Sequence, residues 1–369
     1  VGACAIAAGC RFLAAYPMTP GTPVLEFLAQ RADRYGLVVE QAEDEIAAIN
    51  MALGAAYAGA RAMVTTSGGG FALMVEGLSL AGMIETPVVI HLGQRPGPAT
   101  GLPTRTSQEN LLFALYAGHG EFPRYLCAPA TPESAVYLTM RAFELAEAFQ
   151  VPSIILTDQF LVDSYAVVPA LDPTQVPVRD HTLSPEELQA LPSYERFALT
   201  PSGVSPRALP GASPHLVLVD SDEHDPYGRI TEDLGIRRSM VEKRLRKEEG
   251  LAKETSLPDV YPRDIRGRIV LVGWGSTFGA IREAVESLNA KDDRYGHVHF
   301  QDLWPLRWAE VEEILGPAKA VITVEGNAWG QLGKLLRQEV GIRPLRHLGR
   351  YDGRPFTPED IVEAVSGEA

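Results

Sequence analysis

The stretch Glu40–Phe71, EQAEDEIAAINMALGAAYAGARAMVTTSGGGF, carries more information about function than the rest of the chain. After a cluster of acids, apolar side chains recur at helical spacing, at Ile46, Ile49, Leu53 and Tyr57. Alanines occupy most of the other positions, so the helix has few large side chains and other elements can approach it closely. We therefore expect neighbouring elements to cover it on most sides. A strand over 61–66 and a Thr-Thr-Ser-Gly-Gly-Gly run follow it.

Glu45 falls in the first turn of that helix, where the positive end of the peptide dipoles favours a carboxylate. An acid at a helix start is most often a plain N-cap. Here, however, an acid cluster abuts a helix with few large side chains and then a glycine-rich loop. That combination is typical of a site for a bulky ligand, and the residues alone leave both interpretations open.

The same alternation extends over residues 1–166. Strand-like runs are expected at 10–15, 37–39, 61–66, 87–92 and 152–157, with further helical patterns at 71–81 and 134–148. Strands separated by helices indicate a parallel sheet that is covered on both faces. The sequence therefore predicts an α/β domain over residues 1–166.

Residues 167–262 have a different composition, in which proline and charged side chains dominate. This predicts a linker or extended arm that lies along another surface, with an exposed, charged helix over 239–253. From residue 263 the alternation returns, with strands at 268–273, 297–301 and 320–325 and helices at 278–290, 308–315 and 329–340. Residues 263–369 are predicted to form a second, smaller α/β domain.

Composition argues against several classes of protein. The 369 residues carry 33 basic and 47 acidic side chains, a net charge of −14, which disfavours nucleic acid or anionic membrane as a partner. No apolar run approaches the roughly 20 residues of a membrane helix. Three scattered cysteines are too few for an iron–sulfur cluster and fit a reducing cytoplasm. Because the chain opens at Val1 inside an apolar helical pattern, we expect a piece of a longer polypeptide.

Three loops at predicted strand ends are candidates for chemistry. Tyr16–Thr22 (YPMTPGT) is rigid and presents Thr19 at a strand end, although a simple capped turn fits equally. Thr65–Gly70 offers bare backbone to a phosphate or a planar ring, but its spacing is not that of a Walker A loop. Arg95 follows a buried strand and can grip a substrate carboxylate with two hydrogen bonds. A structural ion pair is the commoner role of a single arginine.

Other motifs carry weaker signals. Gly273–Gly279 approximates a dinucleotide-binding turn, which would suit a nicotinamide-dependent dehydrogenase, but its last interval is one residue too long. Tight packing of a strand against a helix also explains these glycines. The histidines show no metal-binding spacing, and His119 and His224 are candidates only.

In order and spacing, these motifs resemble the α subunits of 2-oxoacid:ferredoxin oxidoreductases, especially the 2-oxoglutarate type, over nearly the whole chain. The matching segments are Tyr16–Thr22, Gln41–Glu45 with its helix, Thr66–Phe71, Gln94-Arg95 with Gly97–Thr104, His119-Gly120, Asp222–His224 with Gly228, Lys243-Arg244, Gly273–Thr277, Glu325–Asn327 with Gly330–Leu332, and Asp352-Gly353. Two positions depart from the family pattern, which has Gly-Pro-Gly at Gly68–Gly70 and Ser-Thr at Ala99-Thr100.

The resemblance implies a thiamine diphosphate enzyme, with residues 1–166 as the pyrimidine-binding domain and residues 263–369 as a transketolase C-terminal-like domain. Glu45 matches the family glutamate that hydrogen-bonds N1′ of the aminopyrimidine. Thr19 and Arg95 match residues near the substrate carboxylate and complete the predicted catalytic set. Predicted cofactor contacts are Glu45, Thr66, Ser67, Gly68, Gly69 and Phe71, and predicted substrate contacts are Tyr16, Thr19, Arg95 and Thr100.

The resemblance also assigns parts of the enzyme to other chains. Mg²⁺ and a 4Fe-4S cluster are expected on a partner β subunit, through which ferredoxin receives electrons, because the chain lacks the motifs for both. A γ domain, separate or fused ahead of Val1, is a further expected partner, and coenzyme A is the co-substrate. The expected reaction converts 2-oxoglutarate to succinyl-CoA, or the reverse. Pyruvate or a branched 2-oxoacid as substrate, and a non-catalytic scaffold subunit, are the alternatives.

Overall fold

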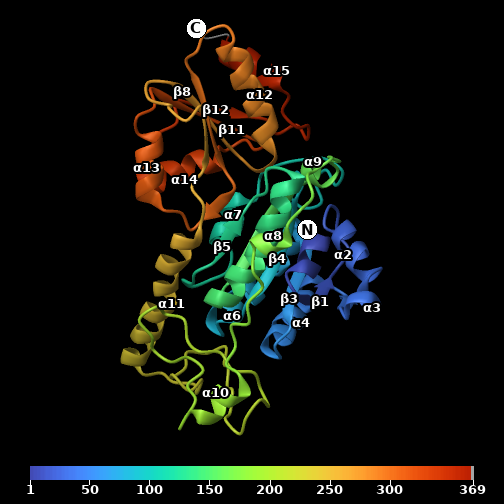
Figure 1. The fold of residues 1–369 in the computed structure, drawn as a ribbon, viewed down its shortest axis with the longest axis vertical. Coiled ribbons are helices and arrows are strands. Elements are labelled where there is room, and N and C mark those ends of the chain that lie inside the picture. Colours follow the sequence, from blue (N-terminus) through green and yellow to red (C-terminus); the bar gives the residue numbers. More distant parts are fainter. Residues whose placement is uncertain (367–369) are drawn as a thin grey trace.

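The computed structural model describes residues 1–366, which form two α/β domains joined by a long arm (Figure 1). The first domain holds a seven-stranded sheet in the order β10-β5-β6-β4-β3-β1-β2; β10 runs antiparallel to β5, and the other pairs are parallel. The strands are β1 (Cys10–Ala15), β2 (Val38–Gln41), β3 (Arg61–Ser67), β4 (Val88–Gln94), β5 (Tyr125–Cys127), β6 (Pro152–Asp158) and β10 (Asp302–Trp304). The predicted α/β class is confirmed.

Helices cover both faces of this sheet, as its apolar strands require. The helices that pack against one face are α1 (Gly2–Ala7), α2 (Thr22–Ala29), α3 (Ala32–Tyr35) and α8 (Pro132–Phe149). The helices that pack against the other face are α4 (Glu45–Tyr57), α5 (Gly68–Leu73), α6 (Val75–Met83) and α7 (Leu111–Tyr116). The helix expected over 71–81 is divided at Met74 into α5 and α6.

Helix α4 begins at Glu45, as predicted, and Asp44 caps it by accepting a hydrogen bond from Ala47 N–H at 2.7 Å. The expectation that the helix is covered on most sides is wrong for the single chain. Ile46 and Met51 are 50% and 41% exposed, because the contacts of α4 with the sheet and with α5 and α6 all lie on the opposite side.

The arm leads away from the first domain through a short 3-10 turn, η1 (Pro173–Gln175), and through α10 (Pro185–Ala190), and returns along α11 (Leu234–Glu254) toward the second domain (Figure 1). The prediction that α11 is simply exposed is wrong. Lys243 and Lys247 are fully buried, because both ammonium groups contact the buried carboxylate of Glu85 in the first domain. These two buried ion pairs therefore hold the arm against the first domain.

The second domain has a five-stranded sheet in the order β12-β11-β8-β9-β7, in which β7 is antiparallel to β9. Its elements are β7 (Asp259–Tyr261), β8 (Ile269–Trp274), η2 (Gly275–Thr277), α12 (Phe278–Asn289), β9 (Tyr295–Phe300), α13 (Trp308–Leu315), β11 (Ala320–Glu325), α14 (Gln331–Val340), β12 (Arg346–Gly349) and α15 (Pro358–Ser366). Because β7 belongs to this sheet, the domain begins before the predicted residue 263.

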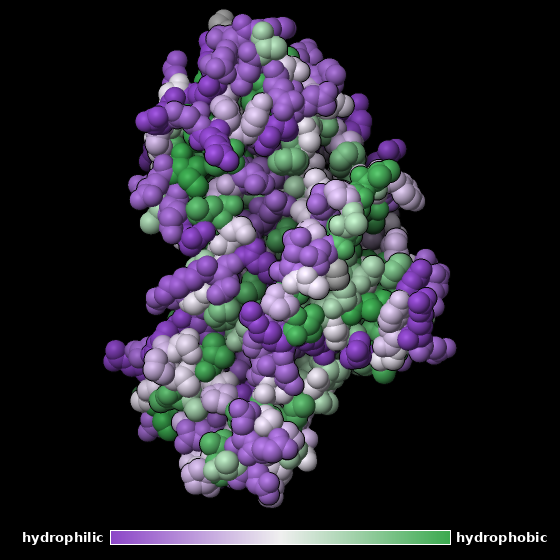
Figure 2. Space-filling model, in the orientation of Figure 1, coloured by the Kyte–Doolittle hydropathy of each residue, from purple (hydrophilic) through white to green (hydrophobic). Residues whose placement is uncertain are grey.

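The two domains share a core. One cluster of buried apolar side chains runs from α4, α5, α6 and α7 into β8, β9, α13 and α14, and β10 extends the first sheet. On the face seen in Figure 2, the second domain shows mainly hydrophilic side chains. Within residues 1–366, no helix is both long and apolar enough to cross a bilayer.

Candidate active site

Two loops and the first turn of a helix meet at the carboxyl ends of neighbouring parallel strands, where ligands of such sheets bind. Tyr16–Thr22 follows β1, Gly68–Gly70 begins α5 directly after β3, and Arg95–Thr104 follows β4. The first loop is pressed onto the end of β3, since a Cβ added to Gly21 would lie 2.8 Å from Thr65 Oγ1 and 3.1 Å from Thr66 N. The three predicted loops are therefore brought together.

Glu45 lies beneath the glycine turn that follows β3. Its side chain is 3% exposed, and its Oε1 is buried without a hydrogen-bond partner in the described chain. A Cβ on Gly70 would clash with this oxygen and with Thr66 Oγ1, so only glycine fits above the carboxyl. Burial raises the pKa of Glu45, and the charge of Asp44 adds to the shift. A buried carboxyl oxygen without a partner is costly, which indicates that a ligand completes it.

Two further buried oxygens without partners flank the same turn, Ser67 Oγ and Asn110 Oδ1. The Asn110 amide lies over Gly68, where an added Cβ would be 3.0 Å from Nδ2. The Asn110 backbone N–H donates to Gln94 Oε1 at 3.1 Å, which holds the residue in place. These unpaired acceptors beside a turn without side chains fit a flat ring that carries N–H groups, such as an aminopyrimidine.

Asn110 is absent from the predicted site because no local pattern marks it. It follows a loop and precedes the short helix α7, with no glycine run and no strand end beside it. Only the folded chain places it beside Gly68.

Arg95 and Thr19 are in direct contact. Arg95 Nη1 donates a hydrogen bond to the Thr19 carbonyl at 2.6 Å, and burial lowers the pKa of the guanidinium. Among residues 1–366, no carboxylate forms an ion pair with Arg95, so the alternative of a structural ion pair is not realised in the described chain. Its remaining N–H groups can bind an anionic ligand.

The other predicted contacts divide into two groups. Tyr16 is 42% exposed, and Thr100 is also exposed, so both can reach a ligand at the rim of the loops. Phe71 is fully buried, and its ring packs edge-on against Phe113 with centroids 5.2 Å apart. Phe71 thus lies in the core beneath the turn, and its contact with a cofactor stays a prediction.

The Gly273–Gly279 turn has a packing role. A Cβ on Gly273 would clash with Ile281 of α12, so the glycine permits tight strand-to-helix contact. The first domain occupies the end of the turn, where Gln108 Nε2 donates to the Trp274 carbonyl at 2.7 Å. This arrangement argues against a dinucleotide site.

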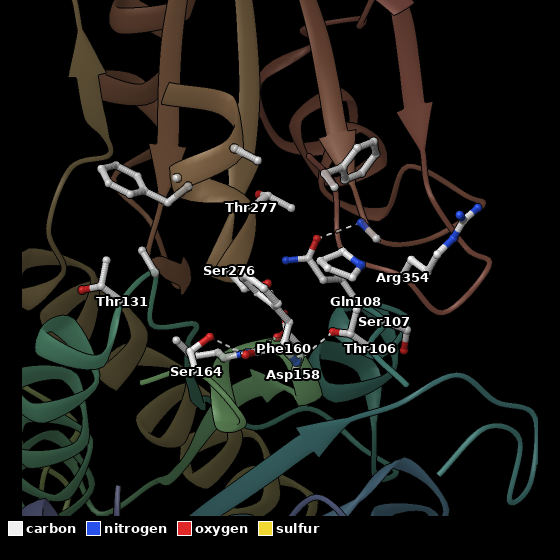
Figure 3. A pocket seen from close by; sticks show the side chains of 18 of the residues that line it. Thr106, Ser107, Gln108, Thr131, Asp158, Phe160, Ser164, Ser276, Thr277 and Arg354 are labelled. Carbon is white, nitrogen blue, oxygen red and sulfur yellow. Dashed lines mark hydrogen bonds between the residues drawn. The ribbon is translucent and has the colours of Figure 1, made fainter. Parts of the chain in front are cut away.

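A cavity of about 320 Å³ lies between the two domains, beside the Gly273–Gly279 turn (Figure 3). Asp158 and Gln108 line it from the first domain, and Ser276 and Arg354 from the second. It contains none of the predicted site residues. Among residues 1–366, no cluster of three or more His, Cys, Asp or Glu side chains is arranged to hold a metal ion.

The buried carboxyl of Glu45 has a consequence for stability. Its pKa is higher in the folded chain than in the unfolded chain, so the folded state binds more protons between these two values and the free energy of unfolding falls as pH rises through them. We expect Glu45→Gln to stabilise the cofactor-free protein at about pH 8 and to have little effect at about pH 4. Urea unfolding at both pH values measures this, and a stabilisation confined to the lower pH would contradict it.

The sequence was compared with protein families and with known proteins. A family model described as pyruvate flavodoxin/ferredoxin oxidoreductase, thiamine diphosphate-binding, matches residues 3–243. The 2-oxoacid:ferredoxin oxidoreductase α subunit of Saccharolobus solfataricus is 37% identical over 97% of this chain and 58% of its own length. The 2-oxoglutarate synthase subunit KorA of Archaeoglobus fulgidus is 33% identical over 99% of this chain and 95% of its own.

Two solved structures are similar to this chain. The 2-oxoglutarate:ferredoxin oxidoreductase of Magnetococcus marinus, with 2-oxoglutarate, coenzyme A and succinyl-CoA bound, superposes with a TM-score of 0.93 at 34% identity, covering all of this chain and 63% of that one. A split-gene transketolase shares the fold at a TM-score of 0.54 and 12% identity. The chain spans less than two thirds of the first of these relatives. It belongs to the family of 2-oxoacid:ferredoxin oxidoreductase α subunits.

Proposed function

We propose that this chain is the catalytic α subunit of a thiamine diphosphate-dependent oxidoreductase that acts on 2-oxoglutarate and works only with a β subunit. The observation that carries the proposal is Glu45, a buried carboxyl with an unpaired oxygen beneath a turn without side chains. The preference for 2-oxoglutarate is supported by the 2-oxoglutarate synthase subunit and by the solved enzyme that binds this substrate.

Glu45 hydrogen-bonds N1′ of the aminopyrimidine and shares its proton. A carboxyl whose pKa is raised by burial suits this task, because it keeps a proton to higher pH than an ordinary glutamate does. Ser67 Oγ and Asn110 Oδ1 accept hydrogen bonds from the same ring, and Thr66, Gly68 and Gly69 form the turn against which it lies. When bound, thiamine diphosphate supplies the nucleophilic carbon and the electron sink that decarboxylation needs.

Arg95 binds the carboxylate next to the oxo group, and the Thr19 carbonyl fixes the guanidinium from the other side. Tyr16 and Thr100 border the substrate at the rim. In the proposed reaction, 2-oxoglutarate, coenzyme A and two oxidised ferredoxins give succinyl-CoA, carbon dioxide, one proton and two reduced ferredoxins. The β subunit supplies Mg²⁺, the 4Fe-4S cluster and the ferredoxin contact, and a γ domain completes the complex.

Replacement of Arg95 tests the substrate half of this site. We expect Arg95→Lys to raise KM about tenfold or more for 2-oxoglutarate and for pyruvate alike, since a point charge replaces a two-pronged grip on a group common to both. Steady-state kinetics of the assembled enzyme measure this. The control is Arg266→Lys, at an exposed arginine paired with Asp264. An effect on 2-oxoglutarate alone would place Arg95 at the far carboxylate instead.

Substrate identity is tested by coenzyme A-dependent ferredoxin reduction with 2-oxoglutarate, pyruvate and branched 2-oxoacids. The highest kcat/KM is expected for 2-oxoglutarate, and a higher value for another 2-oxoacid would reassign the substrate. A complex that binds thiamine diphosphate but reduces ferredoxin with none of them would indicate a scaffold subunit.

A further inference from the structure

His91 belongs to a buried chain of hydrogen bonds that the predicted site does not include. It is fully buried in the middle of β4, opposite Thr65 of β3. Its Nδ1 lies 2.8 Å from Thr65 Oγ1, and its Nε2 lies 2.8 Å from Thr157 Oγ1 of β6. The Thr65 hydroxyl also reaches the Gly21 carbonyl at 3.2 Å. Side chains from three adjacent strands are thus connected to the Tyr16–Thr22 loop.

The chemistry of these groups sets the direction of every bond. A carbonyl only accepts, so the Thr65 hydroxyl donates its one proton to Gly21, and its oxygen must accept from Nδ1–H of His91. Burial lowers the pKa of His91 to about 3, so the ring is neutral and Nε2 carries no proton. The Thr157 hydroxyl then donates to Nε2. Reversing the bonds of His91 would break the Thr65–Gly21 bond and leave the Thr157 hydroxyl proton without a partner among the described residues, although the Gly21 carbonyl would still accept from Val24 N–H at 3.1 Å.

The last bond acts on the loop that carries Thr19. Gly21 lies two residues beyond Thr19, whose carbonyl accepts the hydrogen bond from Arg95 at 2.6 Å. The loop is also pressed against β4, where a Cβ on Gly93 would lie 2.7 Å from Pro20 Cγ. A shift of the Gly21 carbonyl must therefore move the acceptor that orients Arg95.

The cofactor half of the site is independent of this chain of bonds. Thr65 and Thr66 are successive residues of β3, so their side chains point to opposite faces of the sheet. Thr65 faces His91 and Gly21, whereas Thr66 faces Glu45 and Gly70. A defect in the Thr65 bond should therefore disturb the substrate side and spare the cofactor side.

We propose that His91 is a positioning residue which, through Thr65, fixes the loop that carries Thr19 and so sets the guanidinium of Arg95. The effect on substrate binding rests on the proposed function, whereas the chain of hydrogen bonds does not. Because the ring is neutral, it holds this position without titrating in the pH range where the enzyme works.

Thr65→Val in the assembled enzyme nearly keeps the side-chain shape but removes both bonds of the Thr65 hydroxyl, the one it donates to the Gly21 carbonyl and the one it accepts from His91. We expect KM for 2-oxoglutarate to rise about tenfold, the usual worth of one hydrogen bond, with kcat changed less than about threefold. Affinity for thiamine diphosphate should stay within about twofold. The matched control is Thr139→Val, which removes a buried hydroxyl that bonds the Ala135 carbonyl within α8 at 2.6 Å. It should lower thermal stability comparably and leave KM unchanged.

The direction of the bonds is tested separately by ¹⁵N NMR of the histidine-labelled enzyme. We expect His91 as the Nδ1–H tautomer, assigned by the loss of its signal in His91→Gln. An Nε2–H tautomer would overturn the proposed chain, and equal KM values in Thr65→Val and Thr139→Val would overturn the positioning role. If no 2-oxoacid is turned over, the proposed function fails alone, because the tautomer still decides the arrangement of the bonds.

Discussion

Glu45→Gln is expected to lower turnover of 2-oxoglutarate by the assembled enzyme at least about a hundredfold, the usual size of a lost acid–base group. Glutamine keeps the shape of glutamate, so it still fits beneath Gly70 and leaves the fold and the assembly intact. Its amide cannot share the proton of the pyrimidine N1′, which is the task assigned to the carboxyl. Steady-state rates and gel filtration of the reconstituted complex measure both effects.

The matched control is the neighbouring acid. Asp44→Asn keeps the N-cap of α4, because asparagine caps helices as well as aspartate does. It should lower turnover far less than Glu45→Gln, since the charge of Asp44 is only a small cause of the raised Glu45 pKa. Titration with thiamine diphosphate separates a catalytic subunit from a scaffold, since a scaffold would keep its cofactor affinity in Glu45→Gln. Wild-type rates in that variant would defeat the assignment of Glu45.

Glu85→Gln is expected to lower the free energy of unfolding by about 3–5 kcal/mol, because it leaves buried positive charges without their partner. Glu85 receives Lys243 at 2.6 Å and also Lys247, and its backbone carbonyl accepts from Arg196 at 2.7 Å. All four side chains are buried. Burial alone would raise the pKa of Glu85, but the two lysines, with Arg196, lower it to about 2. Urea unfolding measures the loss.

Because of the Glu85 carboxylate, the free energy of unfolding should decrease at low pH. Its folded pKa of about 2 lies below its ordinary value of 4.5, so its contribution is complete above pH 4.5 and is lost as pH falls toward 2. This dependence should be missing in Glu85→Gln. Glu249→Gln serves as the control, because the exposed Lys253–Glu249 pair is worth less than about 1 kcal/mol. Equal losses in the two variants would show that the buried cluster does not fasten the arm.

Local patterns were sufficient for much of the fold. The strands over 10–15 and 320–325 and the helix over 308–315 lie where the sequence predicts them, because each is an apolar run with clear ends. The start of α4 at Glu45 follows from the acids and alanines around it. The contact between Arg95 and Thr19 follows because parallel strands place their carboxyl ends at one edge.

Other features depend on residues far apart in the chain. The charges of α11 are typical of a solvated helix, yet Lys243 meets a carboxylate 158 residues away. Asn110 and His91 have no local mark, since their roles come from Gly68 and Thr65 on neighbouring elements. Strands β7 and β10 have three residues each, too few to show an alternating pattern.

The most direct test is a structure of the complete complex with thiamine diphosphate, in which one distance is measured. We expect a carboxylate oxygen of Glu45 to lie about 2.6–2.9 Å from N1′ of the aminopyrimidine, the range of a charge-assisted hydrogen bond. A pyrimidine bound against another side chain, with the Glu45 oxygen still unpaired beneath Gly70, would contradict the role assigned to Glu45.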